Sequence, residues 1–373
     1  MKLIGQYQVT GRLGKGGFGE VLSAERIQAD GGREKVAIKV LPLVEDRPTA
    51  ATKIRSITNE ARIGRQLKHT NIVRTLGFEQ DRDGWYLILE YLQGSPVDFL
   101  LQDGPLPPRV ALQMAEEICL GLEYAHRLKD RDGQPLELVH RDLKPSNLIL
   151  TIGGVTKIMD FGIARSISNI GVPTASGILK GSPAYMSPEQ VGAARDLGAA
   201  SDIFSLGSVL YELLSGSKLF GSESLTQTWQ RIRTEDVRPH LAPLDRVVPG
   251  VAELLAQALS KDPRARPGAG QMASSLAALR QNLSDGVDLK TYAAQRVRLF
   301  DESARVDELP DEQLRQKRQR ALRYSGGSKL VDARSGEAAR QQKRRTSALI
   351  VGVVVTLIIM AVLIGTLIIG AKS

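Results

Sequence analysis

The hydrophobic period of this sequence changes near residue 105, and the change favours folds in which strands and helices are segregated. Before that point, short β-rich segments are separated by glycine-containing turns, at 7–13, 20–26, 35–41 and 85–91. After it, apolar residues recur with helical spacing in 109–127, 202–215, 251–259 and 270–283. The sequence therefore predicts an α+β, bilobed fold, with a small β-rich lobe over about 7–92 and a larger α-helical lobe over about 93–283.

A second constraint is the run of 24 uncharged residues at 348–371. As a helix this run would be ~36 Å long, which is enough to cross a hydrocarbon core of ~30 Å. The alternative is a buried core helix of a soluble protein, but such helices are usually shorter and carry a polar face. Basic residues at 343–345 precede the run and only residues 372–373 follow it, as a short outer tail. By the positive-inside tendency, we expect a single-pass transmembrane helix with the preceding domain in the cytoplasm.

Residues 284–347 are polar and mixed in charge. They hold 15 Lys or Arg and 10 Asp or Glu, so this segment supplies +5 (15 − 10) of the formal net charge of +9. We interpret the segment as a basic juxtamembrane linker that adds attraction to anionic lipid, with a dedicated binding module as the alternative. The aromatic content of 5% argues against a stacking platform for nucleic acid, and we expect no nucleic-acid partner.

Glycines in the strand-rich half indicate a polyphosphate site. Residues 14–19 read GKGGFG, and the lack of side chains lets backbone amides approach phosphate oxygens. A dinucleotide-binding turn has similar spacing but leads into a helix, whereas 20–26 reads as a strand. Lys39 follows on the next strand and shares a face with Ala37. Glu60, in the next helical stretch, is the candidate carboxylate for an ion pair with Lys39.

The most specific signal is VHRDLKPSN at 139–147, followed by DFG at 160–162. With the glycine loop and Lys39, this ordered set resembles the eukaryotic-like (Hanks-type) protein kinase family, and most resembles bacterial serine/threonine kinases with a single C-terminal transmembrane helix. The resemblance implies a catalytic domain over 7–283 and, for such a bacterial protein, location in the cell (inner) membrane.

The same resemblance implies roles for the motif residues. Asp142 would orient the substrate hydroxyl and accept its proton, while Lys144 steadies the γ-phosphoryl group. Asn147 and Asp160 would bind Mg²⁺, for which Mn²⁺ can substitute. ATP would be contacted by the glycine loop, the strands beside it and the hinge, through Leu13, Gly14, Gly16, Gly19, Val21, Ala37, Lys39, Glu90, Leu92 and Ile149. The DLKPSN form predicts protein substrates that are phosphorylated on Ser or Thr.

Further motifs follow in the helical half. Residues 181–189 resemble a substrate-docking segment, and we expect Glu189 to form a buried ion pair with Arg266. Asp202 is expected to brace the backbone of the catalytic loop, which is the HRDLKPSN segment at 140–147.

The stretch before the docking segment contains Thr174 and Ser176, which we predict to be autophosphorylated in trans. A phosphate there would offer Arg141 a charged partner and so order the loop. The apolar run also contains Ala361 and Gly365 at small-xxx-small spacing, a weak signal for a homodimer.

Two other functional classes fit parts of the pattern. A membrane-bound pseudokinase scaffold would bind partners without catalysis, but such proteins typically lack one of the residues equivalent to Lys39, Asp142 or Asp160, all present here. A small-molecule phosphotransferase of related fold would lack the docking segment at 181–189. We therefore expect an active, ATP-dependent kinase in membrane-associated signalling.

Overall fold

The structure is a computed structural model that describes residues 3–16, 19–28, 31–41, 64–80, 84–130, 132–161, 183–194, 197–222, 224–284 and 286–304. These all belong to one structural unit, Met1–Ala304, and residues 305–373 lie outside the described residues.

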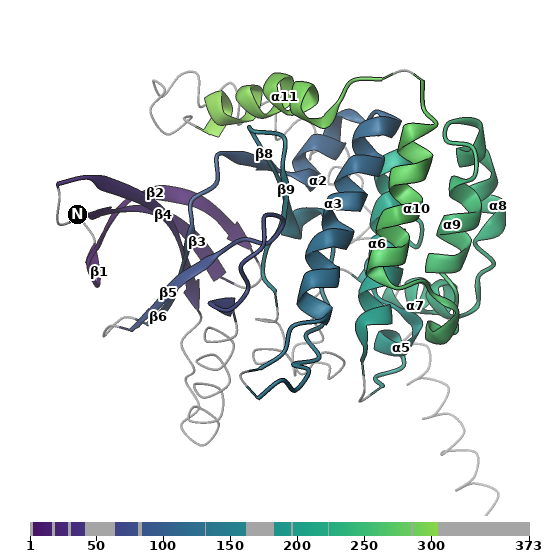
Figure 1. Cartoon of the computed structure of the whole chain (residues 1–373), viewed down its shortest axis with the longest axis horizontal. Coiled ribbons are helices and arrows are strands. Elements are labelled where there is room, and N and C mark those ends of the chain that lie inside the picture. Colours follow the sequence, from purple (N-terminus) through teal and green to yellow (C-terminus); the bar gives the residue numbers. More distant parts are fainter. Residues whose placement is uncertain are drawn as a thin grey trace, which may run out of the picture. The chain divides into compact units, whose positions relative to one another are not determined.

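A six-stranded antiparallel sheet forms the N-terminal lobe, with the order β1-β2-β3-β4-β6-β5 (Figure 1). Its strands are β1 (Leu3–Ile4), β2 (Tyr7–Gly16), β3 (Gly19–Ile27), β4 (Arg33–Leu41), β5 (Thr75–Gln80) and β6 (Trp85–Glu90). Val36 and Ile38 of β4 join an apolar cluster with residues of the neighbouring strands. Because side chains alternate along a strand, Ala37 and Lys39 point to the opposite face.

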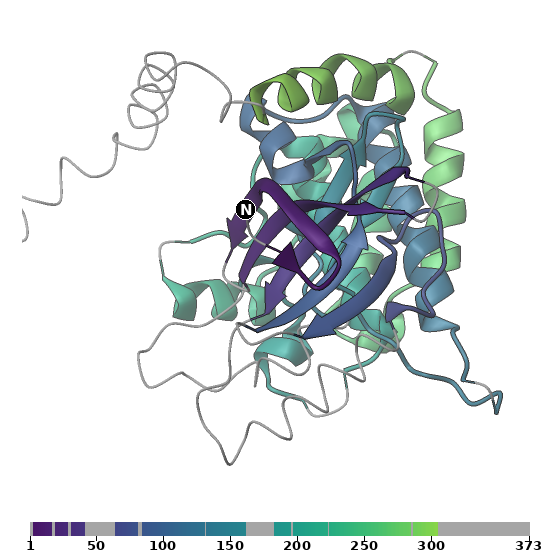
Figure 2. The ribbon, with the colours of Figure 1, turned by 90° about the vertical axis from the view of Figure 1, so that its left-hand side faces the viewer.

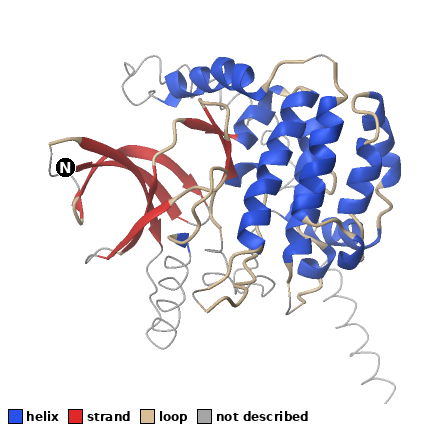
Figure 3. Cartoon of the chain, in the orientation of Figure 1, coloured by secondary structure: helices blue, strands red, loops and turns tan. Residues whose placement is uncertain are grey.

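Helices form the C-terminal lobe, which Figure 3 separates clearly from the strands. They are α2 (Val97–Leu100), α3 (Pro108–His126), α5 (Pro188–Val191), α6 (Ala199–Ser215), α7 (Leu225–Thr234), α8 (Arg238–Leu241), α9 (Val251–Ala258) and α10 (Ala269–Gln281). Short 3₁₀ turns lie between them at Leu101–Asp103, Pro145–Asn147, Pro183–Tyr185, Ala242–Arg246 and Pro263–Ala265.

The centre of this lobe is built around α3 and α6. Proline at the first position of α3 costs no hydrogen bond, because that N–H has no partner within a helix. Helix α6 is buried along most of its length and ends at Gly216, whose φ of 73° is the left-handed conformation that glycine adopts without strain. Together the two lobes confirm the predicted bilobed α+β architecture.

A small antiparallel sheet, β7 (Gly94–Pro96), β8 (Leu148–Thr151) and β9 (Thr156–Ile158), carries the chemical motifs. The HRDLKPSN segment leads into β8, and the DFG segment follows β9. Ile158 joins this sheet to the chain before β5, because its amide donates to the Asn71 carbonyl at 2.8 Å and its carbonyl accepts from the Val73 amide at 2.9 Å. The two motifs are thus held by adjacent strands.

The structure differs from the predicted linker at its start. Residues Leu289–Ala304 form a further helix, α11, which buries Leu289, Tyr292, Ala293 and Val297. Their spacing of three to four residues makes one apolar stripe. The linker prediction was wrong for this stretch, because the many charged residues around the stripe suggested a solvated segment.

The rest of the linker and the apolar run at 348–371 lie outside the described residues. Among the residues that the structure does describe, none of the helices is both long and apolar enough to cross a membrane.

Candidate active site

The backbone of the catalytic loop is strained, and Asp202 of α6 holds it through hydrogen bonds. Arg141 has a φ of 69°, which is uncommon for a residue with a side chain. The Asp202 carboxylate accepts hydrogen bonds from the amides of His140 and Arg141, each at 2.8 Å, and contacts His126 Nε2 at 2.8 Å. This confirms the expectation that Asp202 braces the loop, and it explains how the strain persists.

The Asp142 carboxylate lies within a compact polar cluster. Lys144 Nζ is 2.7 Å from Asp142 Oδ2, and Asn147 Nδ2 donates to the same oxygen at 3.0 Å. Asn147 Nδ2 also donates to the Asp142 carbonyl at 2.7 Å. Two donors therefore fix the position of the Asp142 carboxylate.

Lys39 and Asp160 connect the strand lobe to the small sheet. Lys39 Nζ lies 2.6 Å from Asp160 Oδ2, and the two side chains are 6% and 22% exposed. Sequence reasoning named both residues but did not predict this contact, although their opposite charges and common site were a signal. The expected partner, Glu60, lies outside the described residues, so the Lys39–Glu60 pair stays a prediction.

The DFG segment is tied to the catalytic loop through backbone and ring contacts. The Met159 amide donates to the Asn147 carbonyl at 2.8 Å, and His140 Nε2 lies 2.7 Å from the Met159 carbonyl. The ring of Phe161 meets that of His140 edge-on, with centroids 4.9 Å apart. Asp160 itself has a φ of 60°, which is strained for a residue with a side chain. The contacts of its neighbours Met159 and Phe161 fix it on both sides along the chain.

Residues predicted to contact ATP fall on neighbouring strands. Gly14 is paired with Val21 across β2 and β3, and Val21 is paired in turn with Lys39 of β4. Ala37 is paired with Leu89 of β6, which leads to the hinge, the connection between the lobes at 91–93. The strand register therefore brings four of the predicted residues, Gly14, Val21, Ala37 and Lys39, into one part of the sheet.

The remaining nucleotide candidates lie near the hinge and the loop. Glu90 ends β6, and its carboxylate binds Lys157 Nζ at 2.8 Å, so its side chain joins the lobes. Ile149 is paired with Lys157 across β8 and β9, which places it near the same connection. Leu92 is partly buried in the hinge and Leu13 is 48% exposed on β2. Gly16 and Gly19 are paired with each other at the end of the β2–β3 hairpin.

The chemistry of Asn147 and Asp160 fits a hard divalent cation. With its amide nitrogen donating to Asp142, Asn147 offers its amide oxygen, and Asp160 offers carboxylate oxygen. No cluster of three or more His, Cys, Asp or Glu side chains suited to a metal occurs in the described part of the chain. A pair of oxygen donors matches Mg²⁺ bound mainly through phosphates and water rather than by a protein cage.

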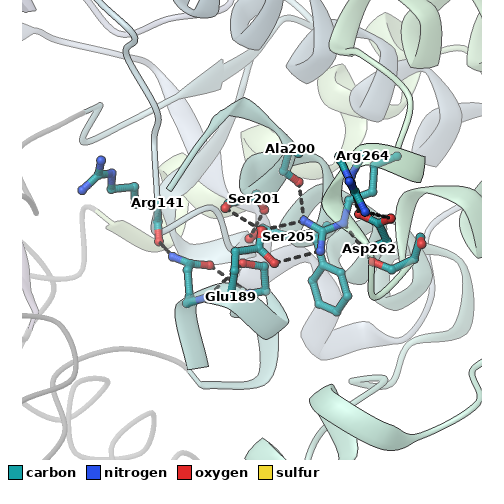
Figure 4. Close-up of polar contacts among 12 residues, drawn as sticks. Arg141, Glu189, Ala200, Ser201, Ser205, Asp262 and Arg264 are labelled. Atoms are coloured by element: carbon teal, nitrogen blue, oxygen red, sulfur yellow. Dashed lines mark hydrogen bonds and ion pairs between the residues drawn. The ribbon is translucent and has the colours of Figure 1, made fainter. Parts of the chain in front are cut away.

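The structure confirms the predicted ion pair between Glu189 and Arg266, and Figure 4 shows Glu189 among the polar contacts around it. Arg266 Nη1 and Nη2 donate to the two carboxylate oxygens at 2.7 and 2.8 Å, and Ser201 Oγ donates to one of them at 2.7 Å. Burial alone would raise the pKa of Glu189, but the hydrogen bonds from Arg266 and Ser201 outweigh it and lower the pKa to about 2. The neighbouring residue Gln190 connects the docking segment to the catalytic loop, because its Nε2 donates to the Arg141 carbonyl at 2.7 Å.

A second buried contact of the docking segment escaped sequence reasoning. Tyr185 Oη donates to Glu212 Oε2 at 2.5 Å, across 27 residues of sequence. Burial raises the pKa of Glu212, although the hydrogen bond from Tyr185 opposes the shift. No local sequence pattern predicts this pair, since Glu212 has the sequence context of an ordinary helix residue. Thr174 and Ser176 of the preceding loop lie outside the described residues.

Comparison with known proteins agrees with this geometry. The model of the protein kinase domain family matches residues 7–276. Among similar proteins, the tyrosine-protein kinase MasK of Myxococcus xanthus is 37% identical over 230 residues, which is 59% of this chain and 34% of MasK.

Two further relatives carry serine/threonine names. PknA of Corynebacterium glutamicum is 33% identical over 288 residues, covering 75% of this chain and 57% of PknA. PrkC of Bacillus subtilis is 34% identical over 266 residues, covering 70% of this chain and 38% of PrkC. The chain thus matches between about a third and somewhat more than half of the length of these relatives.

Proposed function

Because this chain belongs to the protein kinase domain family, we propose that it transfers the γ-phosphoryl group of ATP to Ser and Thr hydroxyls of proteins. The observation that carries the proposal is the cluster at Asp142, in which Lys144 and Asn147 hold the carboxylate while Asp160 lies on the adjacent, hydrogen-bonded segment. Such a cluster offers a base, a positive charge and cation ligands at one place.

The mechanism follows from these positions. Asp142 accepts a hydrogen bond from the substrate hydroxyl, orients its oxygen toward the γ-phosphorus and takes its proton. The bond from the γ-phosphorus to the bridging oxygen of ATP breaks as the bond to the hydroxyl oxygen forms. Lys144 and Lys39 place positive charge near the transferring group and the other phosphates. Mg²⁺, held by Asn147 and Asp160, would neutralise phosphate charge.

The names of the relatives differ on the acceptor residue, so the choice of Ser and Thr needs its own support. MasK is named a tyrosine kinase, whereas PknA and PrkC are named serine/threonine kinases. The argument for Ser and Thr is Lys144, which the resemblance to serine/threonine kinases singled out and which contacts the proposed base directly.

Phosphoryl transfer can be tested on the full-length chain with Mg²⁺ and labelled ATP. We expect label on protein, with phosphoserine and phosphothreonine after acid hydrolysis, and loss of label in an Asp142→Asn protein that still binds nucleotide. Equal labelling of the wild type and this variant would refute the proposal. Nucleotide binding without transfer by the wild type would support the pseudokinase scaffold, and phosphotyrosine alone would move the chain to the class named for MasK.

We propose further that the kinase is anchored in the cell membrane by 348–371, with its catalytic domain in the cytoplasm. The support is the uncharged run and the basic residues at 343–345. Deletion of 348–371 should move the protein from the membrane fraction, resistant to alkaline extraction, to the supernatant. An unchanged distribution would contradict the anchor.

Activation by neighbouring copies would fit such an anchor, because confinement raises the local concentration of kinase. We propose that Thr174 and Ser176 are phosphorylated in trans and that pairing of the membrane helix assists this step. Mass spectrometry of active protein should find phosphate on at least one of the two residues. A Gly365→Ile protein at equal membrane level should show less of it, and unmodified loops in active protein would exclude the proposed activation.

A further inference from the structure

Helix α11 lies beyond residue 276, where the match to the protein kinase domain ends, yet it is built into the catalytic unit. Figures 1 and 2 show α11 across one end of the helical lobe, over β8 and beside α3. Its buried residues belong to the same apolar core as α3, α6 and the small sheet. It is therefore a part of the folded domain whose role the proposed chemistry leaves open.

Several polar contacts fix the start of α11. Asp288 accepts a hydrogen bond from the Thr291 amide at 2.7 Å and so caps the helix. The segment that leads into α11 is held by Arg109 of α3, whose Nη1 donates to the carbonyls of Arg280 and Leu283 at 3.3 and 3.0 Å. An ion pair between Arg296 and Asp103 joins the helix to the turn after α2. The helix is thus anchored at its entry, along its apolar stripe and by a charge pair.

The contact of α11 with the small sheet is close. Helix α11 packs against β7 and β8, and its start lies on the turn between β8 and β9. A Cβ atom on Gly154 of that turn would lie 2.5 Å from Lys290 Cα, so only glycine allows the approach. Gly154 also has a φ of 78°, which favours glycine independently.

The small sheet in turn connects to the hinge. The Ile152 amide, at the end of β8, donates to the carbonyl of the hinge residue Gln93 at 2.8 Å. Pro96 of β7 is paired with Ile149 of β8, a predicted nucleotide contact. Gly94 also packs closely on this strand, because a Cβ there would lie 2.6 Å from Ile149 Cγ2. A shift of β8 would therefore move both Ile149 and the hinge.

We propose that α11 is a positioning element of the nucleotide site: by clamping β7, β8 and the β8–β9 turn, it holds Ile149 and the hinge where they bind ATP. This inference rests on the proposed kinase function for the identity of the nucleotide. It predicts that loosening α11 weakens ATP binding more than it slows phosphoryl transfer, because Asp142 and Lys144 are fixed separately through Asp202 and Asn147.

The test uses the full-length chain with Ala293→Asp, which places a charge in the fully buried stripe, and Gln295→Asp, an exposed position on the same helix, as matched control. Calorimetric titration with Mg·ATP measures nucleotide affinity, and steady-state assays separate KM for ATP from kcat. We expect Ala293→Asp to weaken binding and raise KM about tenfold, equivalent to ~1.4 kcal/mol, with a smaller change in kcat. Gln295→Asp should behave like the wild type.

A second pair approaches the contact from the sheet. Gly154→Ala would collide with Lys290, whereas Gly153→Ala meets nothing closer than Thr151 Oγ1 at 3.9 Å. We expect Gly154→Ala to bind nucleotide more weakly and Gly153→Ala to bind it like the wild type. If Ala293→Asp does not fold, the comparison of these two variants tests the proposal in its place.

Hydrogen exchange gives a readout that does not need activity. Amides of β7 and β8 should lose protection in Ala293→Asp and Gly154→Ala and keep it in the two controls. Unchanged nucleotide affinity in folded variants with a loosened α11 would overturn the inference. Failure of the wild type to bind nucleotide would instead overturn the proposed function, which keeps the two failures distinct.

Discussion

Lys39 Nζ of strand β4 lies 2.6 Å from Asp160 Oδ2, in the segment after β9, and this contact joins the two lobes at the candidate site. A lysine and a proposed ligand of the divalent cation are therefore adjacent in the structure. Nucleotide binding must insert charged phosphates near this pair, so the contact is expected to rearrange when ATP enters.

Replacement of Lys39 by Met should abolish most activity with little effect on folding. Met has a similar length and suits the buried position, in which the Lys39 side chain is 6% exposed. Loss of the positive charge is expected to lower kcat by about 100-fold or more. Labelled phosphate transfer measures the rate, and thermal unfolding serves as the control. A rate within about threefold of wild type would show that Lys39 does not stabilise the transferring charge.

The Glu189–Arg266 pair should make stability depend on acid pH. The Glu189 pKa is about 2 in the folded protein against an ordinary value of 4.5, so its contribution is fully present above pH 4.5 and is lost as pH falls toward about 2. The difference corresponds to roughly 3 kcal/mol. Urea unfolding across this range should show the decline, and Glu189→Gln should remove that part of the slope. If stability declined with falling pH equally in the wild type and in Glu189→Gln, the decline would come from other titrating groups.

Arg266 offers a separate test of the same pair with a neighbour as control. Its guanidinium side chain is fully buried, whereas that of Arg264 is 89% exposed and paired with Asp262. Arg266→Met should destabilise the domain by about 3–5 kcal/mol, because it leaves the Glu189 carboxylate without its bidentate partner. Arg264→Met should change stability little. Similar urea midpoints for the two variants would contradict a structural role for Arg266.

Removal of the Asp202 carboxylate should slow catalysis without a direct contact with substrate. Asp202→Ala leaves the amides of His140 and Arg141 without their acceptor, so we expect a loss of at least about 2 kcal/mol of stability and about tenfold in kcat. Asp202→Asn, which keeps one acceptor oxygen, should lie between. A lower kcat with an unchanged KM for ATP is the expected signature, and an unchanged kcat in folded Asp202→Ala would show that the loop holds its shape without this brace.

Tyr185→Phe should lower stability, because it removes the hydrogen-bond donor of the buried Glu212 carboxyl group. Loss of the hydroxyl donor is expected to cost about 1–3 kcal/mol. It should also raise the Glu212 pKa further, since burial already raises it and the hydrogen bond opposes the shift. A carboxyl group whose pKa is raised in the folded state makes that state less stable as pH increases. The loss of stability caused by Tyr185→Phe should therefore be larger near about pH 8 than near about pH 5. Tyr211→Phe is the matched control, because the described residues offer Tyr211 no hydrogen-bond partner.

Contiguous motifs allowed much of the site to be predicted. Asp142, Lys144 and Asn147 lie within six residues, so a short loop brings them together, and the structure shows their contacts. The pairing of Glu189 with Arg266, 77 residues apart, followed from resemblance to a family and could not follow from spacing. The roles assigned to these catalytic-loop residues remain predictions for assay.

Other contacts could not be predicted because they depend on packing between distant segments. Tyr185 and Glu212 meet only when the docking segment lies on α6, and neither residue is distinctive alone. Helix α11 was missed because four buried residues among many charged ones give a weak periodic signal. Its stripe becomes meaningful only once the surface formed by α3, β7 and β8 is known.

Because the catalytic loop is attached to α6, kinase activity should be lost on warming before the domain unfolds. Asp202 stands between Ser201 and Ile203 on a helix whose interior residues, including Phe204 and Leu206, are fully buried. Small losses of packing around α6 would therefore reach the loop backbone before the domain unfolds. Conservative changes deep in this helix are the places to look for heat-sensitive alleles, in which kinase activity stops at a temperature at which the domain stays folded.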